Sequence, residues 1–405
     1  MKILEVLTYY RPHISGLTIY VERLSRALVQ QGHEVTVLTS QYDKSLPLRE
    51  KIDGVQVHRV PVLFRISKGV IMPTFGHHAT RLARQADVIH LHLPQFDAPG
   101  LALRGRLFGK PVVLTYHCDL RLPDGLFNRL VNQVVLLMNR VAGNLSDAVV
   151  TYTQDYGANS PFLLRYLGKK LHVIPPPVEL AACPTTVAEQ FKRRHDLDDR
   201  SVIGISARIA AEKGIEVLFK ALPAVLERYP RALVLHANPQ TIGEESYARQ
   251  LAPLMERFAD HYRQLGALHG EELTAFYKNL DVLVIPSLNS TESFGLVQIE
   301  AMMNGAPVVA SNLPGVRQPV TMTGMGQVVP IGDHEALAEG IIKVLDNTDR
   351  FRRPGDIIAE SFSPRQTARE YVQLFEALLA GRRETTAGEP EAYETLRQMN
   401  KEHQL

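Results

Sequence analysis

The chain has 405 residues, which is more than one hydrophobic core usually supports, so two domains are expected. Its 45 Lys and Arg against 43 Asp and Glu give a formal net charge of +2, which offers no bulk attraction to nucleic acid and argues against a nucleic-acid partner. Two cysteines, Cys118 and Cys183, and the absence of any apolar run approaching about 18 residues predict a cytoplasmic protein.

The first half of the chain alternates short β-branched runs with longer amphipathic stretches, a βαβ rhythm that predicts a parallel sheet covered on both faces. The expected helices and strands are helices over about 17–31 and 126–145, and strands at 2–7, 34–39, 55–60, 87–93, 111–117, 147–153 and 171–177. Pro175, Pro176 and Pro177 cannot continue a helix or a central strand. We therefore predict a first domain over 1–178 and a polar connector over 179–200.

A second series of the same kind predicts another parallel-sheet domain over 201–363. Its expected elements are helices over about 213–229 and 244–265, and strands at 201–207, 232–237, 267–270, 281–287 and 306–312. A final helix over 364–380 carries an apolar stripe that needs a surface to cover. From residue 381 the chain turns polar and acidic, so 381–405 is predicted to be a frayed tail.

Candidate ligand-binding residues follow strands of the second domain, where doubly wound sheets bind their ligands. Arg208 and Lys213 come at a strand end and a helix start, so they could hold a diphosphate; a surface basic pair is an equal alternative. Gly295 precedes a helix whose free N–H groups and dipole favour an anion. Glu292 and Glu300 could accept hydrogen bonds from sugar hydroxyls, although a structural pairing is the alternative for Glu300.

Other patterns carry weaker signals. His90 and His92 share one face of a strand, but no Cys or third ligand has suitable spacing for zinc, which favours packing or an acceptor-facing role. The stretch 126–140 places Arg129 and Arg140 beside an apolar face and could rest on a bilayer, with packing inside the first domain favoured. No dinucleotide-binding or P-loop glycine motif occurs in its required context.

Several segments together resemble the retaining glycosyltransferases of family four, which have the GT-B fold. These segments are ARIAAEKG (207–214), VLVIPS (282–287), ESFGLVQIE (292–300), EAMMNGAPVVAS (300–311) and SFSPRQTAREYVQLFEALL (361–379). The resemblance spans about residues 1–380. It implies an α/β protein of two Rossmann-like domains whose parallel sheets face each other across a cleft, with the C-terminal helix crossing back to the first domain.

The resemblance also implies roles for matching positions. Arg208 and Lys213 would hold the donor diphosphate, Glu292 would contact the transferred hexose, and Glu300 would bind the ribose hydroxyls. The loop 12–16 would close over the phosphates, and His117 would lie near the hexose. The implied catalytic residues are Arg208, Lys213, Glu292 and His117, and the implied donor-binding residues are Ser15, Gly16, Arg208, Lys213, Phe294, Gly295, Leu296 and Glu300.

Departures from the family pattern leave the nucleotide base unassigned. The family usually has two adjacent glycines where this chain has Ser15 and Gly16, and many members have glycine at the position of Ala207. A glycine pair common in the family is replaced within the segment 236–238 (His-Ala-Asn), and Pro-Asn-Gly is replaced at 176–178 (Pro-Pro-Val).

The expected activity is therefore the transfer of a hexose, with retention, from a GDP-mannose or UDP-glucose type of donor to a glycan, glycolipid or small-molecule acceptor. No metal or other cofactor is expected, because the Asp-x-Asp pattern of Asp196 and Asp198 lies in the polar connector. A GT-B sugar-nucleotide epimerase and a non-catalytic sugar-nucleotide binding subunit are the alternatives. A lipid-linked acceptor would favour a peripheral contact at the inner face of the membrane.

Overall fold

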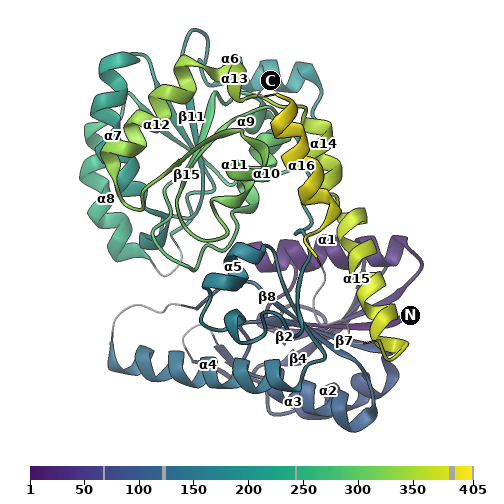
Figure 1. Ribbon diagram of the computed structural model, residues 1–405. Coiled ribbons are helices and arrows are strands. Elements are labelled where there is room, and N and C mark those ends of the chain that lie inside the picture. The colour runs from purple at the N-terminus through teal and green to yellow at the C-terminus, as the bar shows by residue number, and fades with distance from the viewer. Residues whose placement is uncertain (67–68, 121–124, 242–243, 383–387, 404–405) are drawn as a thin grey trace. The chain divides into compact units, whose positions relative to one another are not determined.

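The computed structural model describes residues 1–66, 69–120, 125–241, 244–382 and 388–403, and the chain divides into two compact units (Figure 1). Unit 1 comprises Met1–Pro177 and Phe362–Pro390, and unit 2 comprises Val178–Ser361 and Glu391–Leu405. Each unit contains a mainly parallel sheet with helices on its faces, which confirms the predicted α/β fold with two Rossmann-like domains. Among the described helices, none combines the length and the apolar composition that crossing a membrane requires.

The sheet of unit 1 has the strand order β10-β9-β8-β7-β1-β2-β4-β3, in which all neighbours are parallel except β3 and β4. The strands are β1 (Lys2–Val6), β2 (Glu34–Gln41), β3 (Arg49–Ile52), β4 (Val55–Pro61), β7 (Val88–Leu93), β8 (Val112–Tyr116), β9 (Ala148–Thr151) and β10 (Leu171–Val173). A separate antiparallel hairpin joins β5 (Phe64–Ile66) to β6 (Gly69–Ile71). The chain progresses outward in both directions from β1 and β7, so the topological switch point lies between these two strands.

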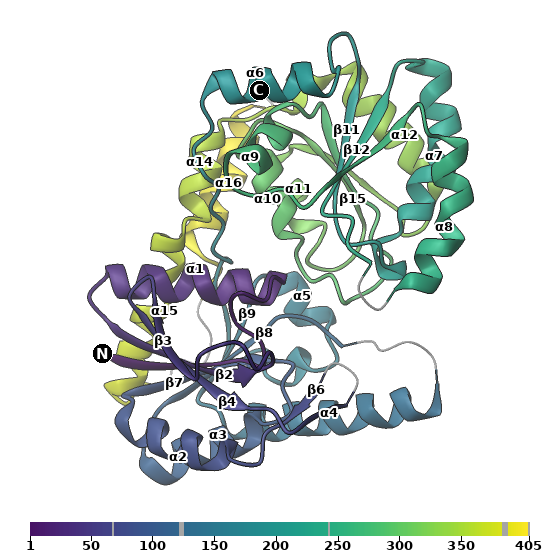
Figure 2. The same cartoon turned by 180° about the vertical axis from the view of Figure 1, so that it is seen from behind.

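The helices of unit 1 are α1 (Gly16–Gln30), α2 (Phe75–Gln85), α3 (Ala98–Phe108), α4 (Leu126–Leu145), α5 (Gln154–Asn159), the 3-10 turn η1 (Leu163–Arg165) and α15 (Pro364–Leu379). Two of them begin at serine caps: Ser15 accepts from the Thr18 amide and Ser363 from the Gln366 amide, at 3.2 Å each. α15 lies beside α1, and their buried Tyr371 and Tyr20 hydroxyls are 2.7 Å apart (Figures 1 and 2).

The two faces of the unit 1 sheet differ in polarity. Alternate residues such as Leu4, Val6 and Leu91 point into an apolar core shared with α2 and α3. The intervening residues of the same strands, including Glu5 and His90, belong to the face that α15 covers through aromatic contacts. One face is therefore an ordinary hydrophobic core, whereas the other buries polar side chains.

The sheet of unit 2 has the order β13-β12-β11-β14-β15-β16 and is parallel throughout, with its switch point between β11 and β14. Its strands are β11 (Val202–Ser206), β12 (Leu233–Ala237), β13 (Tyr262–Gly266), β14 (Val282–Ile285), β15 (Val308–Ser311) and β16 (Gly326–Val329). Its helices are α6 (Thr185–Arg194), the 3-10 turn η2 (Ala211–Lys213), α7 (Ile215–Arg228), α8 (Glu245–Arg257), α9 (Gly270–Lys278), α10 (Leu296–Met302), α11 (Gln318–Thr323), α12 (His334–Asp346), α13 (Thr348–Phe351), α14 (Gly355–Ser361) and α16 (Glu391–Glu402).

Three sequence-based expectations need correction. The connector 179–200 contains α6, which buries Phe191 and packs on α9, so its polar residues mark a solvated helix face. The expected frayed tail over 381–405 contains α16, whose buried residues include Tyr393, Leu396 and Met399 and which packs on α11 and α14. The expected helix 244–265 ends at Arg257 and is followed by β13, while the expected strand at 267–270 is a loop that leads into α9 at Gly270.

Candidate functional site

Two charged side chains meet at the switch point of unit 2. Lys213 follows β11 and Glu292 follows β14, and these strands are parallel neighbours, so their carboxyl ends share one edge of the sheet. The Lys213 Nζ donates to Glu292 Oε2 at 2.6 Å, and both side chains are partly exposed. Arg208 lies in the same loop after β11 and pairs with Glu212 at 3.2 Å. The sequence-predicted residues Arg208, Lys213 and Glu292 therefore gather at one edge of unit 2.

Gly214 allows the loop after β11 and the loop after β14 to approach each other closely. Gly214, directly after Lys213, has φ +64°, in the left-handed region that side chains disfavour. A Cβ at this position would collide with the carbonyl oxygen of Pro286, just beyond β14. The loops are also joined by a hydrogen bond from the Leu288 amide to the Glu212 carbonyl at 2.9 Å. Lys213 is thus held next to the Glu292 loop by backbone geometry.

The conformation of the loop before α10 is fixed by a glycine and by hydrogen bonds from a buried glutamine. Gly295 has φ +76° and immediately precedes Leu296, the first residue of α10, whose amide lies in the first turn without an intrahelical acceptor. Phe294 is buried as a whole residue, so its side chain packs within the fold. The buried Gln298 Nε2 donates to the Phe294 carbonyl at 2.7 Å and to the Val316 carbonyl at 2.9 Å. Sequence reasoning missed Gln298, although a polar side chain on the apolar stripe of a short helix is the signal that points to it.

Glu300 has the structural partner that the sequence left as an alternative. It lies on α10, is nearly buried, and its Oε2 accepts from the Tyr277 hydroxyl of α9 at 2.8 Å. A carboxylate has about four acceptor positions, and the Tyr277 hydroxyl occupies one of them. Glu300 is therefore oriented by Tyr277, and this geometry is compatible with both a structural role and ligand binding.

The position where a glycine pair is common in the family is occupied by a constrained histidine and asparagine. His236 Nε2 donates to the Ala207 carbonyl at 2.8 Å, and its Nδ1 lies 2.6 Å from the Tyr262 hydroxyl. Burial lowers the pKa of His236 to about 4, so the ring is neutral and fixes the end of β11. Asn238 adopts φ +59°, a left-handed conformation that asparagine tolerates better than most residues.

The loop after β1 in unit 1 uses its serine internally. Ser15 Oγ caps α1 through the Thr18 amide, so its side chain is engaged in the fold. Gly16, in contrast, has an ordinary φ, and a Cβ there would meet no atom within 4 Å. Its backbone geometry therefore does not require glycine, and a close approach by a ligand is a remaining reason for one.

His117 lies directly after β8 and is nearly buried. Its Nε2 is 3.0 Å from His92 Nδ1, and its Nδ1 is hydrogen-bonded to the Tyr152 hydroxyl. Burial and the neighbouring charges of His92 and His90 lower the pKa of His117 well below 6.5. The ring is consequently neutral at physiological pH.

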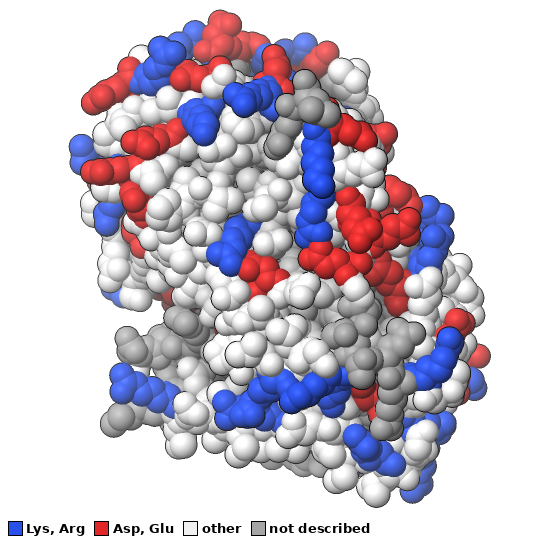
Figure 3. Space-filling model, in the orientation of Figure 1, with Lys and Arg blue, Asp and Glu red and all other residues white. Residues whose placement is uncertain are grey.

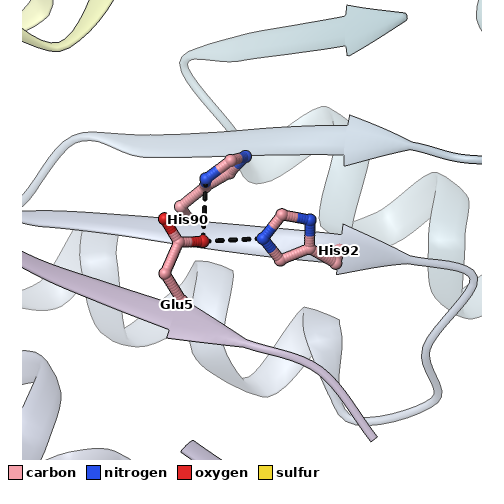
Figure 4. Close-up of side chains that lie close together, drawn as sticks. All are labelled: Glu5, His90 and His92. Carbon is pink, nitrogen blue, oxygen red and sulfur yellow. Dashed lines mark hydrogen bonds and ion pairs between the residues drawn. The ribbon is translucent and has the colours of Figure 1, made fainter. Parts of the chain in front are cut away.

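A buried cluster of Glu5, His90 and His92 lies at the unit 1 switch point (Figure 4). Glu5 Oε2 is 2.6 Å from His92 Nε2 and 2.9 Å from His90 Nδ1, and all three side chains are buried. Burial alone would raise the pKa of Glu5, but the charge of His90 and hydrogen bonds with both histidines lower it to about 2. The sequence-based view that His90 and His92 have no nearby third ligand is therefore wrong. Glu5 pairs with His90 through the strand register, which the sequence does not display.

The two aspartates of the Asp-x-Asp pattern bind basic side chains. Asp198 pairs with Lys192 at 2.9 Å, and Asp196 with Arg200 at 3.3 Å, in the turn after α6. Asp196 has φ +50°, so it forms part of a tight turn. Each carboxylate thus has its own cationic neighbour.

Residues 14–182 match the family described as Glycosyltransferase Family 4, and residues 187–359 match Glycosyl transferases group 1. An uncharacterized glycosyltransferase of Methanocaldococcus jannaschii is 28% identical over 368 residues, covering 86% of this chain and 90% of the relative. A phosphatidyl-myo-inositol mannosyltransferase of Mycolicibacterium smegmatis is 24% identical over 355 residues, covering 86% of this chain and 85% of the relative. The crystal structure of Anabaena HepE in complex with UDP-glucose is similar with a TM-score of 0.73 at 17% identity, covering 93% of this chain and 100% of the HepE chain.

Proposed function

Because the chain belongs to glycosyltransferase family 4, whose retaining members transfer a sugar from a nucleotide sugar, we propose that it moves a hexose from a UDP-glucose or GDP-mannose type of donor to a glycan, glycolipid or small-molecule acceptor. The observation that carries the proposal is the meeting of Lys213 and Glu292, with Arg208 beside them, at the switch point of unit 2. Ligands of open α/β sheets bind at this place. A crystal complex of the fold relative HepE with UDP-glucose and the mannosyltransferase relative leave both donor classes open.

The ion pair can bind two parts of a donor at once. The Lys213 ammonium has three donors and uses one on Glu292, which leaves two for diphosphate oxygens. Glu292 retains acceptor positions for hexose hydroxyls. Arg208 presents a planar fork that suits phosphate, and the amides of Gly295 and Leu296 add further donors. Glu300, oriented by Tyr277, would accept from the ribose hydroxyls.

The proposed chemistry is mainly electrostatic. Negative charge grows on the diphosphate as the bond to the hexose breaks, and Arg208 and Lys213 stabilise this charge. Glu5, a buried carboxylate of unit 1, has no exposure to solvent and cannot act as a nucleophile. We therefore favour substitution on one face of the sugar, with the departing phosphate taking the acceptor proton, and no requirement for a metal. We propose that Ser15, Gly16 and His117 also contribute to donor binding.

Helix α4 suggests an acceptor at a lipid surface. Leu130, Val134, Leu137 and Val141 are exposed and recur at spacings of one helical turn, which places them on one face. The helix contains Arg129 and Arg140 but no acidic residue. Figure 3 shows Lys and Arg side chains across the face of unit 1 along which α4 runs. We propose a peripheral contact with anionic lipid through this helix. Co-sedimentation with phosphatidylglycerol vesicles should fall in a Leu130→Glu/Leu137→Glu variant, and an unchanged bound fraction would contradict it.

A thermal-shift panel of UDP, GDP and ADP tests the donor proposal. A nucleoside diphosphate at about 100 times its dissociation constant adds about 2.7 kcal/mol of apparent stability, so the matching base is distinguished from the others. The corresponding nucleotide sugar is then incubated with candidate acceptors, and the anomeric configuration of the product is read by proton NMR. Interconversion of the sugar with donor alone would indicate an epimerase instead of a transferase.

A further inference from the structure

A chain of hydrogen bonds crosses four adjacent strands of the unit 1 sheet. It joins Glu5 on β1, His92 on β7, His117 after β8 and Tyr152 after β9. Successive links are Glu5 Oε2 to His92 Nε2 at 2.6 Å, His92 Nδ1 to His117 Nε2 at 3.0 Å, and His117 Nδ1 to the Tyr152 hydroxyl. All four side chains are buried, with at most 7% of the residue surface exposed.

The Glu5 carboxylate determines which atom donates in each of these hydrogen bonds. An ionised Glu5 can only accept, so the proton of the first link belongs to His92 Nε2. Burial and the charge of His90 lower the pKa of His92 to about 4, so His92 is neutral and its Nδ1 is an acceptor. The proton of the second link therefore belongs to His117 Nε2. A neutral His117 then offers Nδ1 as an acceptor, and Tyr152 donates to it.

We propose that Glu5 is a positioning residue for His117, which it holds through His92 as the neutral Nε2–H tautomer with Tyr152 donating to Nδ1. The inference rests on the proposed function in that His117 is taken to contribute to the donor site. Both ring nitrogens of His117 are engaged with protein groups. The ring therefore shapes its surroundings and does not exchange a proton with the reacting sugar, which revises the catalytic role that the family resemblance implies for this side chain.

A second set of contacts holds Glu5 in place from the other side. His90 Nδ1 lies 2.9 Å from the same carboxylate oxygen, and His90 Nε2 lies 2.7 Å from the Thr115 hydroxyl. The Thr115 hydroxyl is 2.6 Å from Tyr371 of α15. Thr115→Val removes the hydroxyl that His90 and Tyr371 contact but none of the three hydrogen bonds that lead from Glu5 to Tyr152, which makes it a matched control for the branch that leads to His117.

A metal ion bound by Glu5, His90 and His92 is the competing explanation of this cluster. Two ligands that each lie about 2.0–2.1 Å from a tetrahedral zinc are roughly 3.3 Å apart. The two contacts with Glu5 Oε2, at 2.6 Å and 2.9 Å, are shorter and match hydrogen-bond or ion-pair distances. Glu5 Oε1 has no hydrogen-bond partner within the described parts of the chain, a feature that a metal would explain, so metal content belongs to the test.

The test is long-range ¹H–¹⁵N NMR of the full chain labelled with ¹⁵N-histidine, recorded at neutral pH without substrate. Wild-type His92 and His117 should both show the neutral Nε2–H tautomer. Glu5→Met removes the terminal acceptor and should abolish the single tautomer of His117, whereas Tyr152→Phe, at the other end, and Thr115→Val should preserve it. A role for Glu5 in stability alone would not produce this asymmetry.

Three results would overturn the proposal: an Nδ1–H or charged His117 in the wild type, an unchanged His117 tautomer in Glu5→Met, or stoichiometric metal in the purified protein by mass spectrometry. If Glu5→Met fails to fold, the wild-type and Tyr152→Phe spectra still decide the direction of the chain. The readout needs no turnover, so loss of the proposed transferase activity would leave it intact. Conversely, an active enzyme with the wrong tautomer would refute only the positioning role.

Discussion

The two switch points of this protein, one in each unit, use charged residues in opposite ways. In unit 2, Lys213 and Glu292 lie beyond the strand ends and keep contact with solvent. In unit 1, Glu5, His90 and His92 lie within the strands themselves and are buried. Similar parallel topology therefore supports a partly exposed charge pair in one sheet and, in the other, a buried cluster of Glu5, His90 and His92, which we call the clamp. Burying a charge is costly unless it is paired, and the contacts of Glu5 Oε2 with His90 and His92 offset part of that cost.

The largest expected effect is on the stability of unit 1. Glu5→Ala removes the acceptor on which His90 and His92 converge and leaves a cavity, which should lower the free energy of unfolding by about 3–5 kcal/mol. Urea denaturation measures the change. Glu34→Ala is the matched control, because Glu34 lies on the adjacent strand β2, is mostly exposed and pairs with Lys2 at 3.8 Å. This control should lose less than about 1 kcal/mol. Equal losses in the two variants would show that the cluster is not a clamp.

The next effect is on turnover and tests the unit 2 switch point. Lys213→Ala should lower kcat about a hundred- to a thousandfold, because removing one preorganised donor to growing charge costs about 2.7–4 kcal/mol. Lys192→Ala is the control, since Lys192 is also ion-paired within unit 2, at 2.9 Å to Asp198. It should leave kcat unchanged. Both variants should unfold within a few degrees of the wild type; a normal kcat in Lys213→Ala with saturating substrates would place the diphosphate elsewhere.

The clamp should also make the free energy of unfolding depend on pH. The pKa of His92 is lowered from 6.5 to about 4, so the unfolded chain binds its proton first and stability falls as the pH drops from about 6.5 towards 4. The pKa of Glu5 is lowered from 4.5 to about 2, so its contribution, present above pH 4.5, is lost between about 4.5 and 2. Each group contributes a slope of at most about 1.4 kcal/mol per pH unit. Unfolding midpoints of the wild type and His92→Gln across this range provide the measurement, and parallel curves would contradict the prediction.

The sequence predicts the unit 2 site better than the unit 1 cluster, for a physical reason. Arg208, Lys213 and Glu292 follow apolar strand runs, so the rule that ligands bind beyond strand ends locates them in advance. Glu5 is a single polar residue inside an apolar run, and its partners lie 85 or more positions away. Only the register between β1 and β7 brings them together.

The difference between local sequence patterns and long-range packing also explains the errors in the predicted secondary structure. β13 has only five residues, of which Tyr262 alone is buried, and it begins shortly after α8 ends at Arg257, so it shows no clear period of two and is masked by the longer helical pattern before it. α16 is polar on average, yet its buried Tyr393, Leu396 and Met399 recur at helical spacing and pack on unit 2. In both regions tertiary packing, which a composition-based reading does not include, determines the structure.

The smallest expected effect concerns Glu300, which separates binding from chemistry within the unit 2 site. If Glu300 binds ribose away from the reacting carbon, its contribution is equal in the ground and transition states, so Glu300→Ala should raise the donor KM and leave kcat unchanged. Loss of a hydrogen bond to a charged group costs about 1.5–3 kcal/mol, which corresponds to roughly a ten- to a hundredfold rise in KM. Tyr277→Phe removes the 2.8 Å bond that orients this carboxylate and keeps the carboxylate itself, so a smaller rise of about fivefold is expected from a loss of about 1 kcal/mol. The order of the two effects matters more than their sizes. If Tyr277→Phe raised KM as much as Glu300→Ala did, orientation would account for the whole effect. If Glu300→Ala instead lowered kcat at an unchanged KM, Glu300 would belong with Lys213 in the chemical step.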